Sequence, residues 1–295
     1  MPEALPAWDE LLRGGMVGAG FFGGVRAMWR GDQRFGLKLV PLAEENEREA
    51  DAARLAAECK KLAVIEHPNL RRVYGFIVEP GTAGEGERIK EAGILCELWP
   101  RNLVDYIEDP ATFSWQDTWL RIAVGVATGV AHLHASGLTH GTLKPTNVLL
   151  SRDLVPKVCD GGVMALLSTP EPVHVYLAVE QLKSKDVLGG WPSRAKGDPA
   201  LAHTVDIWSL GGLLIAMATR RPPYGDFIQL QKGQKWKSFG LSLGTLNVLA
   251  KNIDAGLTWP AECMTDETAP SLLIDLATAC TKTNQARQIG RNRPL

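Results

Sequence analysis

The pattern of the sequence changes near residues 96–102, "CELWPRN". Before this point, four segments carry short apolar runs, several of them punctuated by glycine, a pattern typical of β-strands. These segments are 14–30, 33–41, 70–78 and 92–98. After Leu103 the apolar runs are long enough for helices, at 115–136 and 205–219. Strands followed by helices predict an α+β chain with a strand-rich lobe and a helix-rich lobe.

One helix interrupts the strand-rich part. Residues 44–66 are rich in Ala, Glu, Lys and Arg, and Leu55, Cys59 and Leu62 recur at the i, i+4, i+7 spacing of a buried helix face. The glycine- and charge-rich segment 79–93 predicts an exposed hairpin loop, and residues 183–203, rich in Gly, Pro, Ser and Lys, predict an irregular loop.

The composition narrows the class of protein. The chain has 32 Lys+Arg against 33 Asp+Glu, so its net charge of −1 gives no electrostatic reason to expect nucleic acid or an anionic membrane as partner. Its five cysteines form no CxxC pair, which argues against a disulfide framework or a zinc site. No apolar run is long enough to span a bilayer, and the N-terminus lacks a signal-peptide pattern. We expect a cytosolic protein and, because the sequence stops at "RNRPL" without a closing helix, a piece of a longer chain.

A glycine-rich stretch, "GAGFFGGV" at 18–25, is followed by a lysine and a glutamate. Its glycines would let a hairpin backbone approach phosphate oxygens, although alone the stretch indicates only a β-turn. Lys38 ends the strand "FGLKLV", and Glu58 lies twenty residues later in the predicted helix. A lysine and a glutamate on facing elements can pair in a cleft and aim the ammonium at a polyphosphate. The alternative for Glu58 is a solvated helix face.

Together with the motifs that follow them, these segments resemble the protein kinase family along nearly the whole chain. The motifs follow one another in the order found in kinases. They are "HGTLKPTN" (140–147) where the family has HRDLKxxN, "CDGG" (159–162) where it has DFG, "YLAVE" (176–180) where it has Ala-Pro-Glu, and "DIWSLGGLL" (206–214), which resembles a buried helix of the family. The resemblance implies one bilobal kinase-like domain, with an N-lobe at 1–98 and a C-lobe at 99–295. The "HPNL" motif and the helix at 115–136 are closest to the tyrosine-kinase-like branch.

The resemblance also assigns roles to residues. Cys96 takes the gatekeeper position, and Glu97 to Trp99 line an adenine slot. Asn147 and Asp160 would hold Mg²⁺ if the metal binds, and ATP is the implied cofactor. The implied nucleotide-binding residues are Gly18, Gly20, Gly23, Val25, Lys38, Glu58, Cys96, Glu97, Leu98, Trp99, Lys144, Asn147, Leu149 and Asp160.

Three further residues have implied structural roles. Asp206 would hydrogen-bond the backbone of the catalytic loop, and Glu180 would pair with Arg293, or with Arg287. His132 and His134, at the end of a long helix, fit a structural histidine of the family better than a metal site.

The catalytic loop departs from the family. His140 and Lys144 are kept, but Thr142 stands where kinases have the aspartate that accepts the substrate proton, and a threonine hydroxyl is too weak a base at neutral pH. Gly141 replaces the arginine that pairs with a phosphorylated activation loop. No intact catalytic group is therefore expected.

The second departure is Gly161, where the family has an aromatic residue. By spacing, that side chain would complete an apolar column with Leu62, Val73 and His140. We expect a gap in the column unless another group fills it, at a cost of about a few kcal/mol, and greater freedom for Asp160.

Three functions remain open. The first is a pseudokinase that binds ATP and acts as a scaffold or allosteric regulator of another protein or a neighbouring domain. The second is a Ser/Thr or Tyr protein kinase, or another ATP-dependent transferase, of low activity, since loss of a general base costs roughly 10²–10⁴-fold in rate. The third is a nucleotide-free protein-interaction domain whose pocket has collapsed around Gly161.

Overall fold

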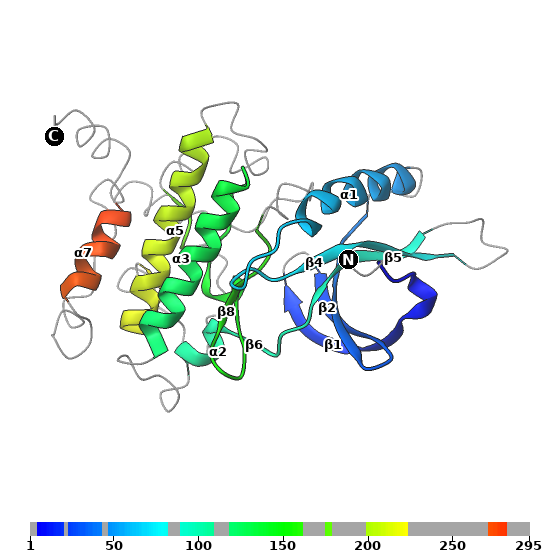
Figure 1. Ribbon diagram of the computed structural model, residues 1–295, viewed down its shortest axis with the longest axis horizontal. Coiled ribbons are helices and arrows are strands. Elements are labelled where there is room, and N and C mark those ends of the chain that lie inside the picture. Colours follow the sequence, from blue (N-terminus) through cyan, green and yellow to red (C-terminus); the bar gives the residue numbers. More distant parts are fainter. Residues whose placement is uncertain are drawn as a thin grey trace, which may run out of the picture.

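The computed structural model describes residues 5–20, 23–42, 47–81, 89–108, 118–161, 175–178, 199–223 and 271–281. A β-sheet with one long helix forms one lobe, and helices dominate the other (Figure 1). The predicted α+β class and bilobal kinase-like architecture are confirmed.

The N-lobe contains a five-stranded antiparallel sheet in the order β1-β2-β3-β5-β4. A short 3-10 helix, η1 (Trp8–Glu10), precedes it. The strands are β1 (Leu12–Gly20), β2 (Gly23–Arg30), β3 (Gln33–Leu39), β4 (Val73–Pro80) and β5 (Ile89–Glu97).

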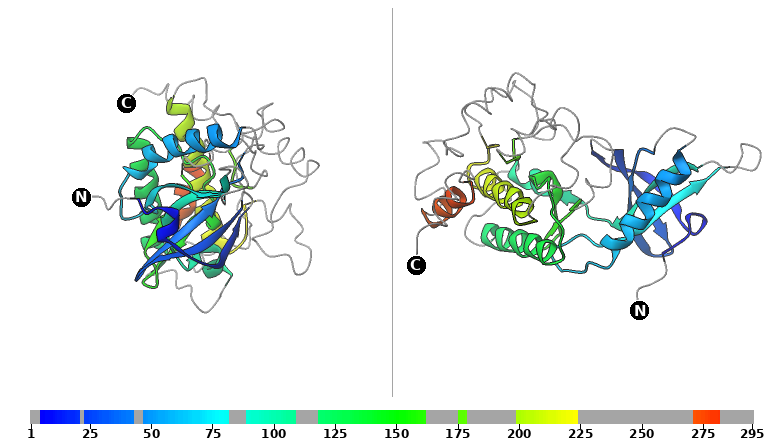
Figure 2. Two further views of the ribbon diagram at one scale, coloured as in Figure 1. Left: turned by 90° about the vertical axis from the view of Figure 1, so that its right-hand side faces the viewer. Right: turned by 90° about the horizontal axis from the view of Figure 1, so that it is seen from above.

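Helix α1 (Arg48–Ala63) covers one face of this sheet, next to β4 and β5 (Figures 1 and 2). Leu55, Cys59 and Leu62 are buried, as their spacing predicts, and cluster with Phe76 and Ile94 of the sheet. Acidic residues in the first turn and lysines in the last turn complement the helix dipole.

The C-lobe combines a small sheet with several helices. Strands β6 (Arg101–Asn102), β7 (Val148–Leu150) and β8 (Pro156–Val158) pair in that order. The helices are α2 (Leu103–Ile107), α3 (Leu120–Ala135), η3 (Pro145–Asn147), α5 (Pro199–Thr219) and α7 (Ser271–Cys280).

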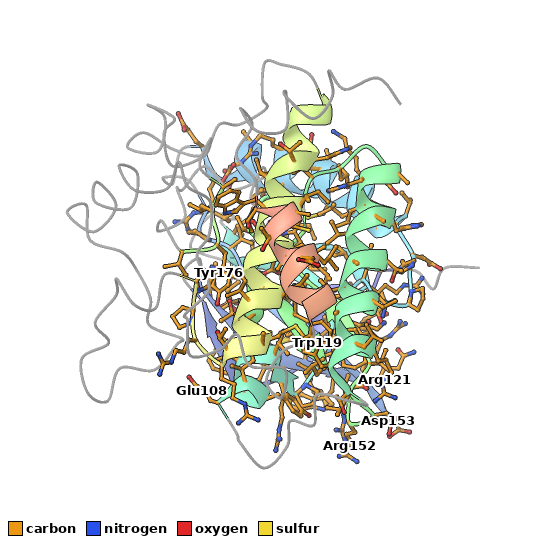
Figure 3. The ribbon with its side chains drawn as sticks, turned by 90° about the vertical axis from the view of Figure 1, so that its left-hand side faces the viewer. Glu108, Trp119, Arg121, Arg152, Asp153 and Tyr176 are labelled. Carbon is orange, nitrogen blue, oxygen red and sulfur yellow. The ribbon has the colours of Figure 1, made fainter. Side chains whose placement is uncertain are left out.

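Helices α3, α5 and α7 lie side by side at the far end of the molecule (Figures 2 and 3). Trp208 of α5 is fully buried in their core. A Cβ at Gly211 would come within 2.8 Å of the Cβ of Cys280, so glycine allows α5 and α7 to pack closely. No helix in the described part of the chain is long and apolar enough to cross a membrane.

The segment before β4, residues 69–71, contacts the C-lobe through backbone hydrogen bonds. Asn69 and Arg71 pair through their backbones with Val158 of β8, at 2.8 Å in both directions. Helix α3 approaches this segment through Gly125 and Gly129, since a Cβ at Gly129 would lie 2.7 Å from the Asn69 carbonyl oxygen. This contact fixes where Arg71 lies relative to the chain that follows β8.

Two predicted loops contain regular structure. Strand β5 begins at Ile89, inside the predicted hairpin loop, because Glu91 is held by Arg13 (2.6 Å) and Arg26 (3.1 Å) across the sheet. Helix α5 begins at Pro199, inside the predicted irregular loop, where the following Ala and Leu residues favour a helix.

Candidate functional site

Asp206 holds the backbone of the catalytic loop through its carboxylate. It is fully buried, and its carboxylate accepts hydrogen bonds from the backbone N–H groups of His140 and Gly141, both at 2.7 Å. His134 Nε2 lies 2.8 Å from the same carboxylate. This is the contact that the resemblance implied. Gly141 has a φ of +81°, which glycine adopts without strain.

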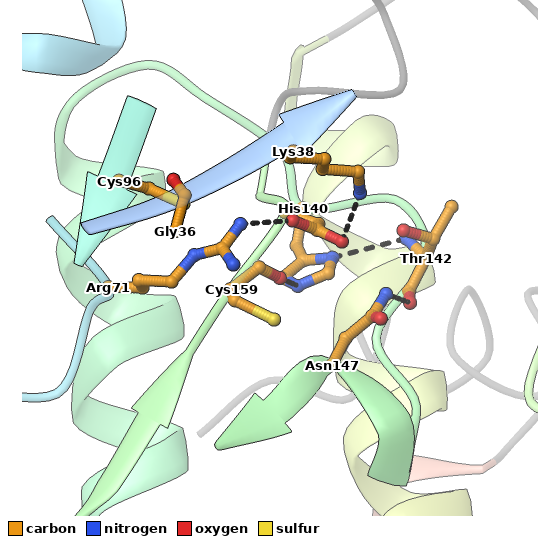
Figure 4. Close-up of polar contacts among 9 residues, drawn as sticks. Gly36, Lys38, Arg71, Cys96, His140, Thr142, Asn147 and Cys159 are labelled. Atoms are coloured by element: carbon orange, nitrogen blue, oxygen red, sulfur yellow. Dashed lines mark hydrogen bonds and ion pairs between the residues drawn. The ribbon is translucent and has the colours of Figure 1, made fainter. Parts of the chain in front are cut away.

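The residue at the position of the catalytic base is buried. Thr142 is 1% exposed, and its hydroxyl has no hydrogen-bond partner within the described ranges. Its N–H donates to His140 Nδ1 (3.3 Å), and the Asn147 side-chain amide donates to its carbonyl (3.0 Å) (Figure 4). Because Nδ1 accepts, the His140 proton lies on Nε2, which donates to the carbonyl of Cys159 (2.9 Å). The loop is therefore held by hydrogen bonds in the way the resemblance implies, but the residue at the position of the base cannot take up a proton at neutral pH.

The lysine of β3 pairs with the aspartate of the "DGG" motif. Lys38 Nζ contacts Asp160 Oδ2, and the guanidinium of Arg71 contacts Asp160 Oδ1 at 2.6 Å (Figure 4). The side chains of Lys38, Asp160 and Arg71 are only 10%, 15% and 7% exposed. Two cations from the N-lobe thus hold one carboxylate of the C-lobe, and we call these three residues the ion-pair cluster.

The predicted Lys38–Glu58 pair is wrong for this structure. Glu58 pairs with Lys61, one turn further along α1, at 2.7 Å. Lys61 is 60% exposed, so this pair lies at the surface of the helix. Asp160 takes the place of Glu58 beside Lys38, and the alternative, a helix-surface position for Glu58, describes this structure better.

Sequence reasoning missed Arg71. The signal was present in "NLRRVYGF", because two arginines precede a strand whose successive side chains point to opposite faces. Arg72 is 38% exposed and pairs with Glu66, whereas Arg71 is 7% exposed and points inward. The Arg71 N–H donates to the carbonyl of Val158, two residues before Asp160, so the backbone pairing brings the guanidinium to the carboxylate.

The electrostatics of the ion-pair cluster follow from its burial. Burial alone would raise the pKa of Asp160, but the charges of Lys38 and Arg71 outweigh it and hold that pKa well below its ordinary value. Asp160 is therefore ionised, and with two cations and one anion the cluster carries a net charge of +1. Such a site attracts an anion such as a phosphate group.

Asp160, one of the two predicted Mg²⁺ ligands, does not fit a metal in this arrangement. Both of its carboxylate oxygens already pair with buried cations, and their fixed positive charges would repel a divalent ion. The amide nitrogen of Asn147 donates to the carbonyl of Thr142, which leaves its Oδ1 as a possible ligand. No group of three or more potential metal ligands occurs among the residues that the structure describes. Greater freedom for Asp160 is also contradicted, since two ion pairs fix it.

Apolar side chains surround Gly36 of β3. A Cβ at Gly36 would lie 3.3 Å from Val25, 3.5 Å from the sulfur of Cys96 and 3.6 Å from Leu98, so these side chains pack closely around the glycine. Val25 and Leu98 are half-buried, as is Leu149 of β7. The resemblance assigns these residues to a nucleobase site, and that assignment stays a prediction.

The glycine-rich segment forms the hairpin between β1 and β2. Gly18 pairs with Val25, and Gly20 pairs with Gly23, so the glycines lie at the end of the two strands. Phe21 and Phe22 lie outside the described residues. The hairpin places its backbone on the same lobe as Lys38.

Residues 96–99 link β5 to the C-lobe, and we call them the hinge. Two of them, Glu97 and Trp99, contact Lys157 of the C-lobe. Lys157 Nζ pairs with Glu97 at 2.8 Å and lies 5.2 Å from the centre of the Trp99 ring. The Glu97 N–H donates to the carbonyl of Arg72 (3.0 Å), and the Arg72 N–H donates to the Glu97 carboxylate (3.3 Å). Behind the hinge is a cavity of about 440 Å³, which we call the rear cavity. Its lining residues are Ile65, Glu66, His67, Pro68, Leu70, Arg72, Tyr74, Glu97 and Lys157.

The two cysteines beside the ion-pair cluster are poor nucleophiles. Burial raises the pKa of Cys96, and burial together with the Asp160 charge raises the pKa of Cys159 to about 12. The Cys96 thiol donates to the carbonyl of Gly36 at 3.0 Å. Both thiols are therefore protonated at neutral pH and act as small packing groups.

The expected gap beside Gly161 is filled. A Cβ at this position would lie 2.7 Å from Leu133 Cδ1 and 3.5 Å from the His140 ring. Leu133 of α3, which is 4% exposed, thus occupies the space that an aromatic side chain would need. The prediction of a void is wrong because the neighbouring helix supplies the missing packing.

Some predicted residues lie outside the described ranges. They are Glu180 and its two candidate partners, Arg287 and Arg293. Lys144 lies within them and is half-buried, at the start of η3.

Comparison with known proteins identifies the class. The family model described as "Protein kinase domain" matches residues 12–290, so this chain belongs to the protein kinase family. Human serine/threonine-protein kinase 16 is 30% identical over 203 residues, which cover 64% of this chain and 60% of that protein. Arabidopsis thaliana mitogen-activated protein kinase kinase kinase 5 is 25% identical over 230 residues, 76% of this chain and 31% of that protein. Leucine-rich repeat receptor protein kinase EMS1, from the same plant, is 29% identical over 240 residues, 78% and 18% respectively. This chain therefore matches less than two thirds of the length of each of these relatives.

Proposed function

We propose that this kinase-like domain is a pseudokinase that binds ATP and acts as a scaffold or allosteric regulator, with little or no phosphotransfer. One observation carries the proposal: a buried threonine, Thr142, stands where the catalytic base is needed. Its hydroxyl meets no hydrogen-bonding group in the described part of the chain that could activate it. The "HPNL" motif and the sequence of helix α3 support a place for the domain in the tyrosine-kinase-like branch.

The nucleotide would bind through parts that the chain retains. The half-buried apolar side chains of Val25, Leu98 and Leu149 suit the base, and the net positive charge of the ion-pair cluster suits the phosphates. Phosphate oxygens approaching Lys38 would compete with Asp160 for its ammonium. Since Asp160 belongs to the C-lobe and Lys38 to the N-lobe, this exchange would change how strongly the lobes are tied together, and so alter a surface offered to a partner protein or domain.

A thermal-shift measurement with ATP tests binding. A ligand at 100 times its Kd stabilises a fold by about 2.7 kcal/mol, which is measurable for a domain of this size. The Lys38→Ala variant should lose the shift. No shift up to millimolar ATP would favour a nucleotide-free interaction domain.

The second candidate is a slow kinase or other ATP-dependent transferase, which the retention of Lys38, Lys144 and Asn147 favours. Phosphoryl transfer depends largely on positioning and charge, so some turnover without a base is chemically feasible. Incubation with radiolabelled ATP separates the two functions. Label that enters protein in the wild type, and disappears in both Lys38→Ala and Asp160→Ala, would identify a transferase.

A further inference from the structure

We propose that Arg71 is a built-in cation that replaces the divalent metal at this site, so that the domain binds a nucleoside triphosphate without Mg²⁺. The inference rests on the proposed nucleotide binding and specifies how the phosphate charge is balanced. Arg71 acts through Asp160 and is thus a positioning residue.

The position of Arg71 is built into the fold. Its side chain is 7% exposed, and its backbone N–H is tied to Val158 at 2.8 Å. The neighbouring Asn69 is held by α3 and β8, because its side-chain amide donates to the carbonyl of Pro156 at 2.9 Å and the Thr128 hydroxyl donates to its Oδ1 at 3.1 Å. A guanidinium fixed in this way remains charged at every accessible pH and cannot leave as a bound ion can.

The charge balance explains why the metal becomes unnecessary. An ionised Asp160 alone would repel a triphosphate, and a metal bridging the two would remove that repulsion. Here Arg71 pairs with Asp160 at 2.6 Å and neutralises its charge, so the ion-pair cluster, with Lys38, keeps one surplus positive charge for a phosphate group. Glu58, which could cancel that surplus, is paired with Lys61 at the helix surface.

The same balance disfavours the metal itself. A divalent cation at Asp160 would stand next to two fixed positive groups in a site with little solvent. Both carboxylate oxygens would also have to give up or share their present partners. The ion-pair cluster therefore selects for an anion without a metal.

The test is the Kd for ATP, measured by isothermal titration calorimetry in EDTA and in excess Mg²⁺. We expect the wild type to bind ATP in EDTA at least as tightly as in Mg²⁺. Binding only with Mg²⁺ would overturn the inference and leave the proposed function standing. No binding in either buffer would overturn both.

Variants assign the effect to Arg71. In Arg71→Leu, Asp160 keeps Lys38 as its partner but regains its affinity for metal, so ATP binding in EDTA should weaken roughly ten- to a hundred-fold and recover with Mg²⁺. Arg71→Lys retains the charge, so its Kd for ATP should stay independent of Mg²⁺. This variant tests the inference even if Arg71→Leu fails to fold. Arg72→Leu, at the adjacent exposed arginine, is the matched control and should behave like the wild type. An unchanged Kd in EDTA for Arg71→Leu would overturn the inference.

Discussion

Two aspartates of the C-lobe, Asp206 and Asp160, are held in opposite ways. Asp206 accepts hydrogen bonds from backbone N–H groups of its own lobe, supported by His134. Asp160 pairs with Lys38 and Arg71, two side chains of the other lobe. The first arrangement is the one that the kinase resemblance implied, whereas the second includes an arginine that the motifs did not assign.

The difference shows which contacts survive changes in sequence. A contact to backbone N–H groups depends on the path of the chain, so replacing Arg and Asp by Gly141 and Thr142 in the same loop leaves it intact. A contact between side chains depends on every residue that can reach it. One arginine at position 71 is therefore sufficient to change the partners of Asp160.

The low pKa of Asp160 keeps its ion pairs intact in mildly acidic solution. Because the pKa of Asp160 is lower in the folded than in the unfolded chain, its pairs contribute their full stability above the ordinary value of about 3.9 and lose it only as the pH falls toward the folded value. The two lobes should thus remain tied together through the physiological range.

The largest loss of stability is expected from replacing Asp206, whose carboxylate accepts the backbone N–H groups of the catalytic loop. Asp206→Asn removes the buried charge and replaces one acceptor oxygen by a donor facing an N–H group, which should destabilise the fold by about 3–5 kcal/mol. Urea unfolding monitored by tryptophan fluorescence measures the change. Asp153→Asn, at an exposed turn of the same lobe (Figure 3), is the control and should change stability by less than about 0.5 kcal/mol. An equal effect of both substitutions would contradict the role given to Asp206.

A smaller effect is expected next to Asp160. Gly161→Phe restores the aromatic residue of the family, but its Cβ would meet Leu133 Cδ1 at 2.7 Å, so the variant should lose about 1–3 kcal/mol. Adding Leu133→Ala opens space for the ring and should recover part of this loss in the same unfolding assay. If Gly161→Phe alone stabilised the protein, the space beside Gly161 would have to be empty, contrary to the packing described.

Glu58 lies outside the ion-pair cluster, although the resemblance implied that it would pair with Lys38. Its partner Lys61 is 60% exposed, and exposed ion pairs contribute little, so Glu58→Gln should change the stability by less than about 0.5 kcal/mol. The Kd for ATP should also stay within about two-fold of the wild type. A ten-fold loss of affinity would mean that Glu58 joins Lys38 when nucleotide binds, and would revise the charge balance of the site.

How far the sequence could predict the site depends on the kind of contact. The order of strands and helices and the buried face of α1 follow from periodicity, and the role of Asp206 follows from the resemblance to protein kinases. The pair of arginines before β4 indicates that one of them points inward, but not what it contacts. The contact with Asp160 requires knowing that residue 71 pairs with Val158, 87 residues away in the sequence. The filling of the space beside Gly161 by Leu133 likewise depends on how α3 packs, which the spacing of motifs does not fix.

The smallest effect concerns His67, which lines the rear cavity beside the segment that positions Arg71. Its Nδ1 accepts the N–H of Asn69 at 3.1 Å, and its ring stacks on His132 at 4.9 Å. Burial, His132 and Lys157 lower the pKa of His67. Because the folded state binds the proton less readily than the unfolded chain, stability should fall as the pH drops below about 6.5.

The variant His67→Asn tests this contribution. Asparagine can accept the same backbone N–H with its side-chain oxygen but does not titrate, so the contact to Asn69 is kept while its pH dependence is removed. The decrease in Tm between pH 7.5 and pH 5.5 should be smaller in the variant than in the wild type, by about 1 °C or less for a group this close to solvent. An unchanged or larger decrease would show that protonation of His67 does not loosen the segment that holds Arg71. The pH dependence would then originate elsewhere, for example at His203, whose pKa is also lowered by burial.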